Sequence, residues 1–192
     1  MELERSYGVL LHPTCFPGPG GVGSLGKEAR AFLDWLNAAQ AHYWQVLPLG
    51  PTGYGDSPYQ AVSSFAGNPY LIDIEALQEK SWTQLEEEAE LPEGWVDFSQ
   101  LYERKWPALR RAHKGFVEKA SRKDKAAYKA FLAEEAFWVQ DYALYRALKE
   151  KHDHRAWDGW PEALKRREAK ALSAARKELA DNVDFHAWTQ WV

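Results

Sequence analysis

The charged residues of this 192-residue chain are unevenly distributed, and this asymmetry limits its architecture more than any single motif does. Residues 1–75 contain only ten charged side chains but most of the 13 glycines and 10 prolines. Such a composition is typical of short strands joined by long loops around a buried centre. Residues 76–192 contain the remaining charges, with apolar residues recurring at helical spacing between them. The sequence therefore predicts a strand-and-loop part followed by a mainly helical part, with the change near residue 77.

Two apolar runs and one amphipathic run in the first part predict a βαβ unit. Residues 7–11 and 43–47 are the strand candidates, and apolar residues between positions 25 and 36 recur at helical spacing. A helix between two strands at this distance gives a parallel, right-handed crossover. The run at 7–11 shows no polar alternation, so we expect that strand to be buried on both faces. Residues 70–74 predict a third, short strand.

The second part is expected to be helical. Residues 101–116 have helical spacing, and we expect Pro107 to begin a helix, because proline is tolerated in the first turn. Between residues 126 and 149 five aromatic side chains lie on one face of a predicted helix, which favours a core-facing stripe over a sugar platform. They are Tyr128, Phe131, Trp138, Tyr142 and Tyr145.

The end of the chain predicts that it belongs to something larger. We expect Pro161 to open one last helix that runs to Val192 without a cap residue. Trp188 and Trp191 would then lie at its tip without partners. Two or three strands also cannot close a sheet. We therefore interpret the sequence as the N-terminal part of a longer protein.

The composition excludes several classes of protein. A net charge of −4 provides no basic surface for nucleic acid or anionic lipid. The sequence has no apolar run near the roughly 20 residues that span a bilayer, and its charged N-terminus does not resemble a secretory signal. A single cysteine, Cys15, excludes an internal disulfide and fits a reducing compartment. We expect a cytoplasmic protein with no nucleic-acid or membrane partner.

Four motifs that suggest a site have simpler structural explanations. Residues 18–23 match the dinucleotide pattern G-x-G-x-x-G, but the loop is long and rich in proline, and the second strand lacks the expected acidic residue. Cys15 has His12 nearby, but nothing in the sequence orients that base. Residues 152–154, His-Asp-His, are interpreted as a solvated turn rather than a metal site, and residues 86–88 as a solvated acidic face. We predict neither a metal site nor a catalytic thiol.

The loop after the second strand is the best candidate for a functional segment. Residues 50–60 are too long for a simple connector, and loops at the carboxyl ends of parallel strands commonly bind ligands. Asp56, Ser57 and Tyr59 form a cluster that could hydrogen-bond sugar hydroxyls while a ring covers an apolar sugar face. Asp73 is expected to fix local backbone. It does not form a convincing catalytic pair with Asp56.

Several segments together resemble one known family, the amylomaltases, which are bacterial 4-α-glucanotransferases. The longest is Trp44-Gln45-Val46-Leu47-Pro48-Leu49-Gly50-Pro51-Thr52-Gly53-Tyr54-Gly55-Asp56-Ser57-Pro58-Tyr59-Gln60. Residues 10–14, 21–26, 67–73, 105–109 and 141–145 are also similar to that family. The resemblance covers essentially all 192 residues, and the longest run is too irregular for a chance match.

The resemblance implies a fold and an activity. The family is built on an α/β fold, a (β/α)8 TIM barrel with helical insertions. Residues 1–76 would be the first βαβ part of the barrel, with its first two strands, residues 77–180 a large, mainly helical insertion, and residues 181–192 a return towards the barrel. The family transfers α-1,4-glucan segments between maltooligosaccharides or starch by a retaining double displacement, and it needs no cofactor.

The resemblance also implies which residues bind glucan. Asp56, Ser57 and Tyr59 would line the donor side of the cleft, and Tyr54 and Tyr102 are weaker candidates for contacting a long glucan. No position corresponds to the family's catalytic acids, so no catalytic residue is assigned and the chain alone is predicted to be inactive.

Two other functions stay open at the level of sequence. The chain could be a non-catalytic glucan-binding module, or a helical scaffold whose aromatic residues only pack. Burial of Tyr54 and Tyr59 would indicate the scaffold. We also expect the chain to be poorly stable or to self-associate through its unpaired barrel edge.

Overall fold

A computed structural model describes residues 5–18, 20–53, 55–84 and 95–192. The chain divides into two compact units, Met1–Ala120 and Ser121–Val192. Tyr54 and the acidic run at residues 86–88 lie outside the described residues. Among the residues that are described, no helix combines the length and apolar composition needed to cross a membrane.

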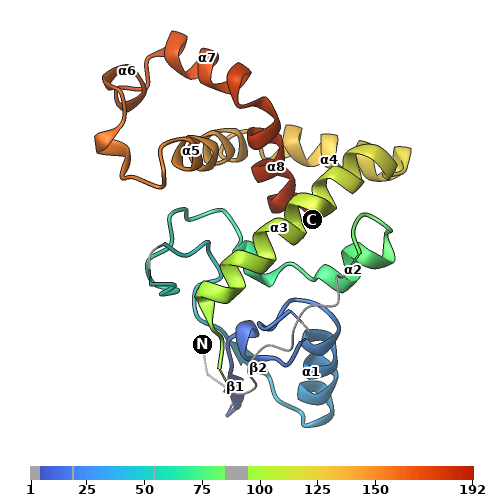
Figure 1. Ribbon diagram of the computed structural model, residues 1–192. Helices are drawn as coiled ribbons and strands as arrows, with labels where there is room; N and C mark the ends of the chain where they lie inside the picture. Colours follow the sequence, from blue (N-terminus) through green and yellow to red (C-terminus); the bar gives the residue numbers. More distant parts are fainter. Residues whose placement is uncertain (1–4, 19, 54, 85–94) are drawn as a thin grey trace. The chain divides into compact units, whose positions relative to one another are not determined.

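The first unit contains the strands and three of the described helices (Figure 1). Its elements are β1 (Gly8–Leu10), η1 (Pro13–Cys15), α1 (Lys27–Ala38), β2 (Tyr43–Gln45), η2 (Pro69–Leu71), α2 (Ile74–Glu79) and α3 (Phe98–Lys119), where η denotes a short 3-10 turn. The second unit contains α4 (Arg122–Glu134), α5 (Val139–Lys151), η3 (Trp157–Gly159), α6 (Glu162–Lys165), α7 (Ala169–Glu178) and α8 (Ala180–Trp191).

The predicted βαβ unit is confirmed. β1 and β2 pair in parallel, with Val9 opposite Trp44, and α1 lies between them in the chain (Figure 1). The Trp44 indole donates to the carbonyl of Leu11 at 2.7 Å, and its ring packs against Phe16 and Phe32. These contacts hold the ends of both strands against α1, so the loops that follow the strands begin at fixed positions.

The expectation that the first strand is buried on both faces is wrong. Val9 is half-buried, whereas Gly8 and Leu10 are exposed. Within the described residues the sheet consists of β1 and β2 alone, so it offers little cover to the side chains of either strand. An unbroken apolar run shows that a strand has apolar side chains on both faces. It does not show that other elements cover those faces.

The third strand expected at residues 70–74 does not form. Asn68 instead accepts the backbone N–H of Tyr70 and starts η2, and Asp73 accepts the N–H of Glu75 and starts α2. Side-chain oxygens at these two positions satisfy the free N–H groups of a helical turn. Two capping residues five positions apart therefore override the strand propensity of the apolar residues between them.

Pro107 lies inside α3 rather than at its beginning, contrary to expectation. The helix begins at Phe98 because Asp97 accepts the N–H groups of Ser99 and Gln100. Proline removes the hydrogen bond to the carbonyl four residues earlier, at Glu103. Both Pro107 and Glu103 are exposed, so that carbonyl faces the solvent side of the helix, where water can satisfy it.

The second unit departs from its predicted helices in two places. A turn at residues 135–138 divides the expected stripe of residues 126–149 between α4 and α5, so the five rings do not share one helix face. Its interpretation as core is nevertheless confirmed, because Tyr128 and Tyr142 are buried and the other three are half-buried. The single helix expected after Pro161 is three helices, α6, α7 and α8.

The end of α8 packs against other helices of the second unit, which overturns the expectation of an unpartnered tip. α8 packs along α5, and His186 Nε2 lies 3.0 Å from Glu150 Oε1. Trp188 is 0% exposed, and the ring of Trp191 lies 5.5 Å from that of Tyr128 on α4. Spacing alone could not reveal that the chain turns back and packs α8 against its own preceding helices.

Candidate functional site

The loop that leaves β2 is a closed structure with its own internal hydrogen bonds. Its ends meet where the N–H of Asn68 donates to the carbonyl of Leu49 at 2.8 Å. Thr52 and Ala61 form an antiparallel bridge inside the loop, and the N–H of Val62 donates to the carbonyl of Pro51 at 3.1 Å. Residues 49–68 therefore form a compact surface loop rather than a loose connector. We call it the glucan loop, after the binding role that the family resemblance implies for Asp56, Ser57 and Tyr59.

The glucan loop surrounds a hollow of about 570 Å³. The side chains and backbone that line it come from residues on both arms of the loop. They are Pro48, Leu49, Gly50, Pro58, Tyr59, Ala61, Ser63, Ser64, Phe65, Ala66 and Gly67. Two aromatic rings in this lining are strongly exposed, Tyr59 at 73% and Phe65 at 63%. Exposed rings beside hydroxyls and backbone carbonyls suit a ligand with both apolar and polar surfaces, such as a sugar.

The predicted cluster of Asp56, Ser57 and Tyr59 lies in one turn of this loop. Asp56 adopts a positive φ of 52°, and its carboxylate accepts from the hydroxyl of Thr52 at 3.0 Å. The carbonyl of Ser57 accepts the N–H of Gln60. Tyr59 lines the hollow, whereas Asp56 and Ser57 are half-buried in the turn that leads into it. The exposure of Tyr59 argues against a scaffold whose aromatic residues only pack.

Of the other two predicted glucan contacts, only Tyr102 can be placed relative to this hollow. Tyr54 lies outside the described residues. Tyr102 is on α3, where its exposed ring lies 6.2 Å from that of Trp106, and it is not among the side chains that line the hollow. Phe65 is the residue that the sequence reasoning missed. A large aromatic side chain in the small-residue segment Ser63-Ser64-Phe65-Ala66-Gly67 was the signal that could have identified it.

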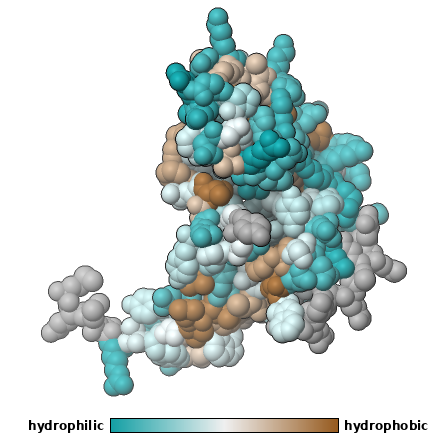
Figure 2. Space-filling model, turned by 60° about the vertical axis from the view of Figure 1, so that its left-hand side comes forward, coloured by the Kyte–Doolittle hydropathy of each residue, from teal (hydrophilic) through white to brown (hydrophobic). Residues whose placement is uncertain are grey.

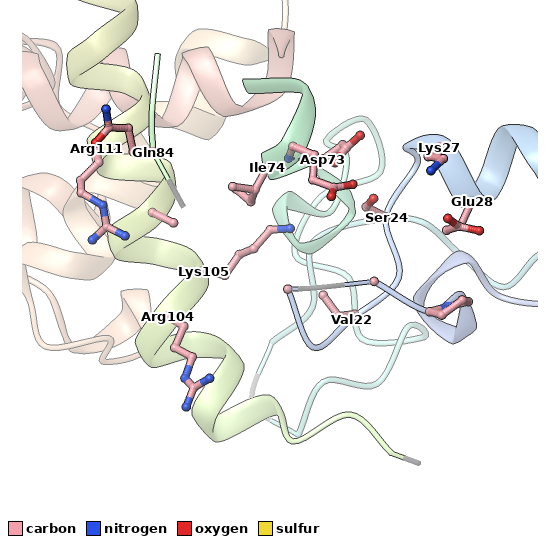
Figure 3. Close-up of a pocket in the computed structure, with 15 residues that line it drawn as sticks. Val22, Ser24, Lys27, Glu28, Asp73, Ile74, Gln84, Arg104, Lys105 and Arg111 are labelled. Carbon is pink, nitrogen blue, oxygen red and sulfur yellow. Dashed lines mark hydrogen bonds between the residues drawn. The ribbon is translucent and has the colours of Figure 1, made fainter. Parts of the chain in front are cut away.

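A second hollow, of about 490 Å³, lies beside α3 (Figure 3). Its lining includes Ser24, the start of α1 at Lys27 and Glu28, and the start of α2 at Asp73. From α3, Lys105 extends towards Asp73, and Arg104 and Arg111 flank it along the helix. Seven of the fifteen described residues in this lining are charged and none is aromatic, so no ring is available there to stack on a sugar face.

Lys105 is the most unusual titratable group in the first unit. It is only 5% exposed, and its ammonium donates to the backbone carbonyl of Ile72 at 2.5 Å. Burial lowers the pKa of Lys105 to about 8 from an ordinary 10.5, and the carboxylate of Asp73 opposes part of that shift. Desolvation disfavours the charged form of a lysine, which is the direction observed.

This lowered pKa predicts a pH dependence of stability. Between pH 8 and 10.5 the unfolded chain binds more protons at Lys105 than the folded chain does, so stability rises with pH across that window. The unfolding free energy of the wild type minus that of Lys105→Met should rise by about 2 kcal/mol between pH 7.5 and 9.5. Urea denaturation at the two pH values measures it, and a flat difference would show that Lys105 titrates normally.

The carboxylates of Asp56 and Asp73 hold local structure. Asp56 accepts from Thr52, and Asp73 fixes local backbone as predicted, although it does so by capping α2 rather than within a strand. Gly26 packs closely against Asp73, and a Cβ there would lie 2.2 Å from Asp73 Oδ2, so a larger residue would displace the capping carboxylate. Retaining glycosyl transfer needs two carboxyl groups that flank one sugar bond, roughly 5 Å apart. Asp56 accepts from a side-chain hydroxyl and Asp73 from a backbone N–H, so both carboxylates hold local structure and the arrangement suits binding rather than bond breaking.

The remaining motifs also have structural roles. His12 caps η1, with its Nδ1 2.7 Å from the hydroxyl of Thr14, and Cys15 is exposed. Within the glycine-rich loop, a Cβ at Gly23 would lie 2.1 Å from the carbonyl of Pro13, so a close backbone approach explains that glycine. Residues 152–154 form a turn after α5, and His152 stacks on Trp160. In the described ranges no three His, Cys, Asp or Glu side chains are grouped to hold a metal ion.

Comparisons with known proteins give a consistent picture. A family model described as 4-alpha-glucanotransferase matches residues 11–192. The chain is 56% identical to a 4-alpha-glucanotransferase of Thermus thermophilus over its full length, and 42% identical to one of Aquifex aeolicus over 98% of its length. It also superimposes on an amylomaltase from Streptococcus agalactiae in complex with acarbose, with a TM-score of 0.89 and 37% identity over 98% of the chain.

The chain spans 38% of the length of each of these three proteins. The resemblance to amylomaltases seen in the sequence is confirmed by the family match, the identities and the structural similarity together. The match begins in the first turn after β1 and continues through both compact units. On this evidence the chain belongs to the 4-alpha-glucanotransferase family.

Proposed function

We propose that this chain forms one wall of the glucan-binding cleft of a 4-α-glucanotransferase and does not supply the catalytic acids. The observation that carries this proposal is the hollow of the glucan loop, with the exposed rings of Tyr59 and Phe65 in its lining. Tyr59 stacks on a sugar face, Ser57 hydrogen-bonds a sugar hydroxyl, and Asp56 fixes the turn that presents both. Tyr54 and Tyr102 contact glucan further along a long substrate.

The location of the loop supports a barrel with its cleft at this end. β1 and β2 are parallel, and the glucan loop follows the carboxyl end of β2, which is where (β/α)8 barrels bind ligands. We propose that β1 and β2 are the first two barrel strands, that residues 77–180 are an insertion beside the cleft, and that residues 181–192 return towards the barrel. The complex of the similar amylomaltase with acarbose fits a ligand-binding role.

The proposed reaction is a retaining double displacement, in which an α-1,4-glucan segment passes through a covalent intermediate to the 4-hydroxyl of another glucan. The described residues near the hollow contribute binding and orientation, and the nucleophile and the acid/base residue come from other polypeptide. No cofactor is required for such a displacement. The substrates are maltooligosaccharides or starch, and the reaction takes place in the cytoplasm.

A chimera tests this function. Residues 1–192 replace the matching segment of the Thermus thermophilus relative, and maltotriose disproportionation is followed by chromatography. We expect the chimera to transfer glucan segments and the 192-residue chain alone to leave maltotriose unchanged. A folded chimera without transfer, together with glucan binding by the chain alone, would indicate a non-catalytic glucan-binding module. Transfer by the chain alone would place catalytic acids within it.

The strands of the first unit predict self-association. Large apolar side chains are exposed on β1, α1, β2 and the residues beside them, namely Tyr7, Leu10, Leu33, Trp35 and Tyr43. Figure 2 shows apolar side chains gathered towards the lower end of the molecule. Unpaired strand edges and apolar surface favour association between copies. Sedimentation velocity of the 192-residue chain should show oligomers that increase with concentration, and a monomer at all concentrations would contradict this prediction.

A further inference from the structure

Lys105 lies on the buried face of α3, where packing would favour an apolar residue. Leu101 and Leu109, one turn before and one turn after it on the same helix face, are both buried. Replacing the aqueous shell of an ammonium with protein is costly, and an apolar side chain at this position would avoid that cost. The hydrogen bond that Lys105 makes is therefore expected to explain why a lysine occupies this buried position.

That contact holds the exit of the glucan loop. The ammonium donates to the carbonyl of Ile72 at 2.5 Å, between the end of η2 and the Asp73 cap of α2. η2 begins at Asn68, whose N–H closes the glucan loop on Leu49. Only three residues lie between Asn68 at the loop closure and Ile72, whose carbonyl Lys105 binds.

The hydrogen bonds inside the loop cannot orient it on the rest of the unit. The Thr52–Ala61 bridge and the Asn68–Leu49 bond join the loop to itself and to the residues that enter it. Hydrogen bonds that tie its exit to other elements include those from the N–H of Leu25 to the carbonyl of Leu71 at 2.9 Å and from Lys105 to Ile72. The first comes from the loop before α1 and the second from α3.

We propose that Lys105 is a positioning residue for the glucan loop. By anchoring Ile72 to α3 it fixes the exit segment of the loop and so the hollow that carries Tyr59 and Phe65. The charged groups that share its cavity are Lys27, Glu28, Asp73, Glu75, Arg104 and Arg111. The purpose of this role rests on the proposed glucan-binding function. The effect of the Lys105–Ile72 bond on the loop can nevertheless be measured without any glucan.

Hydrogen exchange on Lys105→Met tests the link. Methionine preserves most of the side-chain volume and removes the donor, so amides of the glucan loop, including those of Val62 and Asn68, should exchange roughly tenfold faster, while α1 is unchanged. The matched control is Leu109→Ala, one turn away on the same buried face, which destabilises the unit and leaves the hydrogen bond from Lys105 to Ile72 in place. Equal acceleration throughout the unit in both variants would overturn the positioning role.

A second measurement uses the unaltered chain, in case the variant fails to fold. Acetylation of Lys105 by a small reagent requires the bond to Ile72 to open, whereas Lys114 on the same helix is exposed. A saturating maltooligosaccharide should slow both loop exchange and Lys105 acetylation by a common factor and leave Lys114 unaffected. Slowing of loop exchange without slowing of Lys105 acetylation would overturn the inference. Absence of any glucan effect would instead count against the proposed function.

Discussion

Replacing Trp188 with alanine should lower the free energy of unfolding of the second unit by about 3–5 kcal/mol, the usual cost of deleting a fully buried tryptophan. Trp188 is 0% exposed, and its helix α8 packs along α5, with Phe185 and His186 also buried. The cost combines the lost apolar contact with the cavity that a rigid helical pair cannot close. Urea denaturation followed by circular dichroism measures it.

Trp157 provides the matched control, because it is the same residue type in the same unit but is 53% exposed in η3. Trp157→Ala should change the unfolding free energy by less than about 0.5 kcal/mol, as expected for a surface substitution. A loss of similar size in the two variants would mean that α8 does not bury Trp188 in solution. The end of α8 would then be unpartnered, as expected from the sequence.

The second large effect is expected in glucan affinity. Replacing both Ser57 and Tyr59 with alanine should weaken binding of a maltooligosaccharide by about 2–3 kcal/mol, because an exposed aromatic anchor and a hydrogen-bonding hydroxyl are lost together. This corresponds to a rise in Kd of roughly 30- to 150-fold. Fluorescence titration measures Kd, and unchanged thermal unfolding would show that the loop stays folded.

Tyr43→Ala is the control for that double replacement. Tyr43 is an exposed tyrosine at the start of β2, away from the lining of the glucan-loop hollow. Its loss should leave Kd within a factor of about two. An equal effect of Tyr43→Ala and the double replacement would remove the binding role assigned to Ser57 and Tyr59.

Local patterns predicted the elements that depend on local physics. The βαβ unit followed from two apolar runs and a helical repeat, and the structure pairs β1 with β2 in parallel around α1. The role of Asp73 in fixing local backbone was predicted for the same reason, although the helix that it caps was not. Side chains that bond to neighbouring backbone leave a signature within a few residues.

The errors arose where one local signal competed with another or with tertiary packing. At residues 70–74 the caps at Asn68 and Asp73 overrode an apolar strand-like run. Pro107 stays within α3 because the carbonyl it leaves unbonded is on the solvent side, and solvent exposure is not written in the local sequence. The burial of Trp188 depends on α8 folding back along α5, a contact between segments far apart in the chain.

The sequence predicted where the candidate site lies, but it predicted only some of the residues that line it. The length of the loop and its Gly, Pro and Tyr content identified residues 50–60, and Tyr59 lines the hollow. Phe65 was missed because it lies beyond the quoted motif, on the returning arm of the loop. Lys105 was missed because a lysine in a charged helix is normally solvated, and only the packed structure places this one against Ile72.

Calorimetric titration of the 192-residue chain with a maltooligosaccharide, followed by chromatography of the sugar, tests the central claim most directly. If the glucan loop is a wall of the cleft and the bond-breaking groups lie in other polypeptide, we expect saturable heat of binding and an unchanged distribution of chain lengths. No heat with any α-1,4-glucan, or the appearance of new chain lengths, would contradict that claim.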